Sequence, residues 1–163
     1  MQEELYKRFS SKMYAVCLRY ASNSDDAQDI LQDGFVKIFK NLEKFRGEGS
    51  FEGWVRRIFV NTAIEHLRKK TPMVSIGEKE ERALPLSEKN ALDNLAEKDI
   101  LALIQQLSPG YRTVFNMYVI EGYTHKDIGE ILGISEGTSK SQLARARVIL
   151  QDKVKEHLLK KNG

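Results

Sequence analysis

The chain has 163 residues, of which 41% are hydrophobic and 30% are charged, a balance typical of a folded protein rather than a fibrous or disordered one. Lys and Arg together number 26 against 23 Asp and Glu, so the net charge of +3 is too small to indicate a nucleic-acid partner without a local concentration of cations. Because no apolar run approaches the roughly 20 residues that span a bilayer and the amino terminus lacks the features of a secretory signal, we expect a cytoplasmic protein.

Three segments of the amino-terminal half carry apolar residues at helical spacing, residues 5–20, 30–42 and 51–67. The first contains the single cysteine of the chain, Cys17, within an apolar stretch and without an acidic or histidine neighbour. A lone thiol cannot form an internal disulfide, and we interpret Cys17 as a core residue rather than a reactive thiol.

The second segment has a cluster of acidic residues near its start. Ser24 is a candidate N-cap, and the two aspartates that follow it would lie favourably at the positive end of the helix dipole. Asp29 and Asp33 lie one turn apart further along the helix, with Gln32 beside them. Such a row suits a basic protein partner through polar pairs that set orientation and encounter rate, but a plain solvated acidic face explains it equally well.

The third segment is more basic than the rest of the chain, since residues 54–70 hold five cations and one acid. We expect Trp54 to lie in the core. A narrow polar strip contains Arg57, Asn61 and Arg68, which fall within about 40° of one another on a helical wheel. Arginines and aromatic residues beside an asparagine suit unstacked single-stranded bases, so this strip is a candidate nucleic-acid surface.

Helical spacing is lost at residues 69–90, where two of the three prolines, a glycine and a mixed run of charges occur together. We interpret this stretch as a flexible linker, placed at residues 71–92, between two small helical domains at residues 1–70 and 93–163. No stretch of the chain alternates convincingly like a strand, so the predicted fold class is all-α.

Helical spacing resumes in the carboxy-terminal half, at residues 100–107, 114–120 and 128–150. Thr124 and Asp127 have the spacing of a capping box in its Asp variant, just before an apolar stripe. Gly133 then allows the backbone angles of a tight turn, and Ser135 is a candidate cap for a second helix. This order of signals is the pattern of a helix-turn-helix.

The second helix of this motif has one stripe for the core and one side of small and basic residues. The stripe expected to face the core consists of Ser139, Leu143, Ala146 and Leu150. The opposite side consists of Gly137, Ser141, Ala144 and Val148, flanked by Lys140, Arg145 and Thr138, with Arg147 adding to the basic face. Small residues let a helix lie deep in a DNA major groove about 12 Å wide, while the cations reach base edges and phosphates. Alternatively, the small residues pack against another helix and the cations are solvated.

Taken together, these residues resemble the bacterial RNA polymerase sigma factors, specifically the short extracytoplasmic-function group that keeps only the domains called sigma-two and sigma-four. The stretch DAQDILQDGF is similar to region 2.2, and FRGEGSFEGWVRRIFVNTAIEHLRKK is similar to regions 2.3 and 2.4. Residues 107–150, which begin LSPGYRTVF and end LARARVIL, are similar to region 4. The resemblance covers almost the whole chain. It implies a sigma-two-like helical bundle joined to a sigma-four-like helix-turn-helix domain.

This resemblance implies a transcription initiation factor, not an enzyme, that binds core RNA polymerase and directs it to promoter DNA. It implies no cofactor, metal ion or small-molecule substrate, and members of the family are often held inactive by an anti-sigma protein. By the same resemblance Asp29, Gln32 and Asp33 would face the clamp helices of the largest catalytic subunit, which favours the protein-partner interpretation of the acidic row.

The resemblance also divides promoter recognition between the two domains. Asn61, with Arg57 nearby, matches the position that helps to capture a flipped base of the minus-ten element as the strands part, and Arg68 belongs to the same strip. The duplex of the minus-thirty-five element would be met by Lys140, Ser141, Ala144 and Arg145, with Thr138 and Arg147 beside them.

Three positions depart from the family pattern. Ser139 stands where the family often has Val, and Gln142 stands where it often has Arg, so one phosphate or base contact is expected to be missing or replaced. Glu65 places an acid at a strip position that would face the melted strand, which argues against a contact there.

Two other functions compete with this one. An autonomous helix-turn-helix regulator would bind its operator without polymerase, usually as a dimer on paired half-sites, but it leaves the amino-terminal half unexplained. An enzyme is disfavoured because His66, His125 and His157 lie far apart without metal-ligand spacing. The sequence also lacks a phosphate loop, a nucleophile elbow or a paired-acid arrangement.

Overall fold

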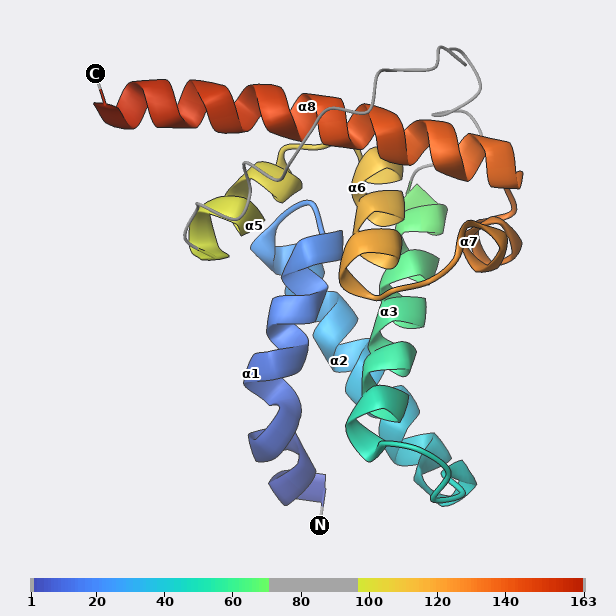
Figure 1. The fold of residues 1–163 in the computed structure, drawn as a ribbon. Helices are drawn as coiled ribbons and strands as arrows, with labels where there is room; N and C mark the ends of the chain where they lie inside the picture. Colours follow the sequence, from blue (N-terminus) through green and yellow to red (C-terminus); the bar gives the residue numbers. More distant parts are fainter. Residues whose placement is uncertain (1, 71–96, 163) are drawn as a thin grey trace. The chain divides into compact units, whose positions relative to one another are not determined.

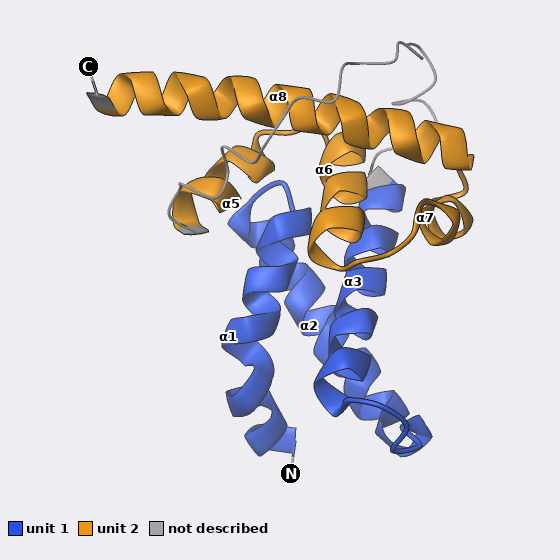
Figure 2. Cartoon of the chain, in the orientation of Figure 1, with its two compact units in different colours: residues 1–71 blue, residues 72–163 orange. Residues whose placement is uncertain are grey.

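The computed structural model describes residues 2–70 and 97–162, and within these ranges the regular elements are all helical (Figure 1). The all-α prediction is therefore confirmed. The chain divides into two compact units, Met1–Thr71 and Pro72–Gly163 (Figure 2). The predicted linker, residues 71–92, lies outside the described residues. In the two described ranges no helix is long and apolar enough to cross a membrane.

The first unit is a bundle of α1 (Gln2–Tyr20), α2 (Ser24–Asn41) and α3 (Phe51–Lys70), with a short 3-10 helix, η1 (Leu42–Lys44), after α2. Each of the three α-helices packs against the other two. Their shared core includes Met13, Cys17, Ile30, Ile38 and Phe59, each at most 1% exposed. Burial raises the pKa of the Cys17 thiol to about 12, which agrees with its interpretation as an inert core residue.

The cap of α2 differs from the prediction by one residue. Asn23, not Ser24, precedes the first turn, and its side-chain oxygen accepts a hydrogen bond from the backbone N–H of Asp26 at 2.8 Å. Asparagine caps a helix about as well as serine does, and Asn23 has the extended backbone that a cap requires. The helix therefore begins at Ser24, and the acidic residues predicted near its positive end do lie in its first turn.

The second unit contains α5 (Glu97–Gln105), α6 (Pro109–Phe115), a turn of π-helix, η3 (Asn116–Ile120), α7 (His125–Leu132) and α8 (Glu136–Asn162). The long helix α8 packs against α5, α6 and α7. Arg112 of α6 is 1% exposed and donates hydrogen bonds to the carbonyl oxygens of Gln105 and Leu107 at 3.1 and 3.4 Å. These bonds tie the end of α5 and the turn that follows it to α6.

Helices α2 and α3 approach each other closely at Gly34. A Cβ atom added at Gly34 would lie 2.2 Å from a ring carbon of Phe59, whose side chain is fully buried. Glycine is therefore required here for packing, although it is an unfavourable residue inside a helix.

We expect Gly34→Ala to lower the free energy of unfolding of the first unit by about 1–3 kcal/mol, because the added methyl group would force the buried ring of Phe59 to shift. Trp54, the single tryptophan, lies in α3, so urea unfolding followed by its fluorescence reports this unit alone. Gly53→Ala is the matched control, since its Cβ would meet only Ser50 at 3.6 Å. That change should stabilise the unit by up to about 1 kcal/mol. Equal effects of both changes would refute the close approach.

Candidate nucleic-acid interface

The turn between α7 and α8 has the chemistry that the sequence predicted. The hydroxyl of Thr124 accepts a hydrogen bond from the backbone N–H of Asp127 at 3.1 Å, which caps α7. Gly133 follows α7 in the left-handed conformation, with φ of 73°. The hydroxyl of Ser135 then accepts a hydrogen bond from the backbone N–H of Thr138 at 3.0 Å and caps the start of α8. These contacts confirm a helix-turn-helix with α8 as its second helix.

Helix α8 buries the stripe that was expected to face the core. Its members, each at most 4% exposed, are Ser139, Leu143, Ala146 and Leu150. Gln142 is also buried, at 2% exposed, so its side chain belongs to the interior of the unit. This burial was not predicted from the sequence, because the buried side of α8 is broader than its apolar stripe.

The six predicted duplex-binding residues all lie outside the buried side of α8. Lys140 and Arg147 are exposed, and the half-buried members are Thr138, Ser141, Ala144 and Arg145. The hydroxyl of Ser141 donates within its own helix, to the carbonyl oxygens of Gly137 and Thr138 at 3.1 and 3.2 Å. The outer side thus combines short side chains with cations, which is the composition that lets a helix enter a major groove.

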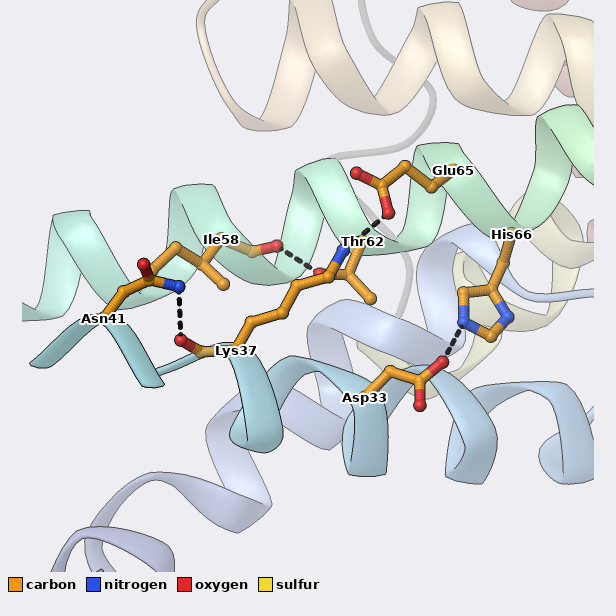
Figure 3. Close-up of polar contacts among 7 residues, drawn as sticks. All are labelled: Asp33, Lys37, Asn41, Ile58, Thr62, Glu65 and His66. Carbon is orange, nitrogen blue, oxygen red and sulfur yellow. Dashed lines mark hydrogen bonds and ion pairs between the residues drawn. The ribbon is translucent and has the colours of Figure 1, made fainter. Parts of the chain in front are cut away.

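The acidic row lies on the surface of α2 in the first unit. Asp29, Gln32 and Asp33 are all exposed, as a protein-binding surface requires. Asp33 is engaged within the unit, because its carboxylate lies 2.6 Å from Nε2 of His66 on α3 (Figure 3).

A hollow of about 490 Å³ borders the acidic row and was not predicted from the sequence. It is lined by polar side chains, Gln32 of the row and Gln28, and by apolar side chains of α1 and α2 that include Tyr6 and Val36. These two side chains are 49% and 46% exposed, so both contribute apolar surface to the hollow. Val36, one turn after Gln32, could have revealed the hollow, because it interrupts the polar side of the predicted helix.

The basic strip on α3 is present as predicted. Arg57, Asn61 and Arg68 are exposed. Glu65, at the edge of the strip, is paired with Lys37 of α2, whose Nζ atom lies 2.5 Å from the carboxylate (Figure 3). The acid that argued against a nucleic-acid contact is therefore neutralised by a cation from the neighbouring helix.

Trp54 is only half-buried, so it is less enclosed than the sequence suggested. It lies in an aromatic cluster with Phe45 and Phe51, at ring centroid distances of 5.5 and 5.7 Å. Trp54 precedes Asn61 by two helical turns and therefore lies on the same side of α3.

Known proteins match both units of the chain. Residues 5–72 match the family Sigma-70 region 2, and residues 97–150 match the family Sigma-70, region 4. The chain is 30% identical to the ECF RNA polymerase sigma-E factor of Haemophilus influenzae, over 92% of this chain and 85% of that protein. It is 29% identical to the ECF RNA polymerase sigma factor SigE of Mycolicibacterium smegmatis over 95% of this chain, and it spans 62% of the length of that relative.

A solved structure has the same fold. It is the sigma factor RpoE of Bartonella quintana, determined in complex with the anti-sigma factor NepR. The TM-score is 0.58 at 22% sequence identity, and the match covers 94% of this chain and 96% of that one.

The pair of Lys37 and Glu65 gives a test of the basic strip. We expect Lys37→Met to weaken binding of a single-stranded oligonucleotide about twofold to fivefold, because it leaves the carboxylate of Glu65 without its cation beside the strip. Adding Glu65→Gln should restore the affinity. Lys40→Met, at an exposed lysine of the same helix, controls for the loss of one positive charge. Fluorescence anisotropy measures all three, and a double variant that binds no better than Lys37→Met would contradict the interpretation.

Proposed function

The chain belongs to the extracytoplasmic-function sigma factors, transcription initiation factors that direct RNA polymerase to promoters, and we propose that it reads a promoter with two surfaces carried by separate units. The observation that carries this proposal is the outer side of α8, where short side chains and exposed cations stand opposite a fully buried stripe. A helix of this kind packs one side against the core and leaves the other side available to DNA.

The second unit recognises the minus-thirty-five element as duplex. Lys140 and Arg147 are exposed cations that suit base edges and phosphates, while Ser141 and Ala144 let the axis of α8 approach the floor of the groove. Thr138 and Arg145 lie beside them on the same helix. Each base contact of this kind discriminates by about 1–3 kcal/mol, and the phosphate contacts make the binding steeply dependent on salt.

The first unit holds the minus-ten element as a melted strand. Arg57 and Arg68 supply positive charge along α3, and the amide of Asn61 has donors and acceptors for the edge of a flipped base. Trp54 offers a half-exposed ring on the same side of the helix for stacking. Trapping an unpaired base costs a few kcal/mol of unstacking, and these contacts would offset that cost.

Core RNA polymerase binds the acidic row of α2, Asp29, Gln32 and Asp33, through the clamp helices of its largest subunit. The row supplies negative charge for a basic partner, and the adjoining hollow lined by Tyr6 and Val36 supplies apolar area. The polymerase then fixes the spacing between the two DNA surfaces. Two weak sites on one assembly reinforce each other through their effective concentration.

The remaining partner is an anti-sigma protein, which would act by covering one of these surfaces. This part of the proposal rests on the Bartonella quintana factor, which was determined with such a protein bound. The proposed role places the chain in the cytoplasm with the polymerase. It needs no catalytic centre, cofactor, metal ion or small-molecule substrate of the chain's own, in keeping with the sigma factors that it resembles.

The two surfaces can be separated by mutation. We expect Lys140→Ala to weaken binding of the upstream duplex by the polymerase complex about fivefold or more, because it removes one cation from the outer side of α8. The same change should leave polymerase association unchanged. Asp29→Lys should weaken polymerase association in a pull-down and leave duplex binding by the chain alone unchanged.

Lys155→Ala, at an exposed lysine further along α8, is the matched control for the first change. If Lys140→Ala and Asp29→Lys each impair both activities to the same extent, the assignment of the two surfaces is wrong. Tight binding of a duplex by the chain without polymerase would instead favour an autonomous regulator.

A further inference from the structure

His125 is held on two sides at the start of α7. Its Nδ1 atom lies 2.8 Å from the hydroxyl oxygen of Ser139, a residue of α8 that is fully buried. Its ring stacks on that of Tyr118, with centroids 4.3 Å apart and an angle of 16° between the planes. A ring fixed by a hydrogen bond at its edge and a stack on its face has little freedom to rotate.

This bond reaches the part of α8 that was assigned to duplex recognition. Ser139 directly precedes Lys140, and Lys140 and His125 line the same surface hollow of about 510 Å³. Helices α7 and α8 also pack against each other and are joined by the short turn around Gly133. The hydrogen bond of His125 with Ser139 adds a directional polar contact to this packing, next to a side chain proposed to face DNA.

The ring acts through this bond rather than through a charge. Burial lowers the pKa of His125 from its ordinary value, nearby Lys140 and Arg147 lower it further, and Glu136 opposes them. The other ionisable groups around the hollow are Tyr118, Tyr123 and Lys126. Because the folded protein disfavours protonation, His125 is neutral at pH 7, and a neutral imidazole can either donate to the hydroxyl of Ser139 or accept from it.

We propose that His125 is a positioning residue for promoter recognition, which through Ser139 refines the rotation of α8 that its buried stripe sets and thereby determines which base edge Lys140 reaches. This inference rests on the proposed function of α8. Base readout depends on the direction of each side chain, whereas attraction to phosphates depends mainly on charge. A shift of α8 should therefore change sequence preference more than general affinity for DNA.

The test measures base preference on a library of upstream elements, bound by the full chain together with core polymerase. His125→Phe keeps an aromatic ring for the stack on Tyr118 and removes the hydrogen bond, and Ser139→Ala removes the other partner. We expect each change to reduce discrimination at the base read by Lys140 about twofold to tenfold, with the salt dependence of binding unchanged. The double variant should be no worse than either single one, because all three lack the same bond.

His157→Phe replaces a histidine elsewhere on α8 and is the matched control, with no expected change in preference. Thermal melting shows whether each variant is folded. If His125→Phe does not fold, Ser139→Ala alone tests the inference. The inference is overturned if the single effects add in the double variant. It is also overturned if affinity falls equally for every member of the library.

Lys140→Ala in the same library separates this inference from the proposed function. If it changes base preference and the His125 and Ser139 variants do not, positioning by His125 is wrong and recognition by α8 stands. If Lys140→Ala leaves base preference unchanged, recognition by α8 fails and the inference fails with it.

Discussion

The burial of one side of each functional helix is the constraint on which the rest of this structure depends. Helix α8 buries the residues from Ser139 to Leu150 that recur at helical spacing, and this fixes Lys140 and Arg147 on the outer side. Helix α3 packs against both α1 and α2, which leaves Arg57 and Asn61 on its exposed strip. Each unit is small, so a helix that turned its polar side inward would lose much of the available core.

Polar contacts between helices add to the packing of the buried cores. In the first unit, Asp33 pairs with His66 and Lys37 pairs with Glu65, which joins α2 to α3 (Figure 3). Exposed pairs of this kind contribute little to stability, so their importance lies in the charge that they present. The carboxylate of Glu65 is neutralised beside the basic strip, and the acidic row is tied to the helix that carries that strip. A change at one surface of the first unit can therefore affect the other.

The features that were predictable from the sequence are those fixed by neighbouring residues. A helix cap, a left-handed glycine and a stripe at helical spacing depend on a few positions, and the turn at Gly133 was correctly predicted for that reason. The pairing of Lys37 with Glu65 was not predictable, because it joins residues 28 apart and depends on how two helices align. The burial of Gln142 was missed for the same reason, since a helical wheel does not show how broad the covered side is. The contact of His125 with Ser139 was not predictable either, because it joins residues 14 apart on two different helices.

Run-off transcription tests the central claim most directly. Purified chain and bacterial core polymerase would be combined on promoter templates whose upstream and minus-ten elements are varied independently. The account predicts initiation only when the chain and the polymerase are both present, with a loss of transcript when either element is altered and a larger loss when both are. A chain that binds a duplex tightly alone, yet neither associates with the polymerase nor yields a transcript from any template, would contradict it.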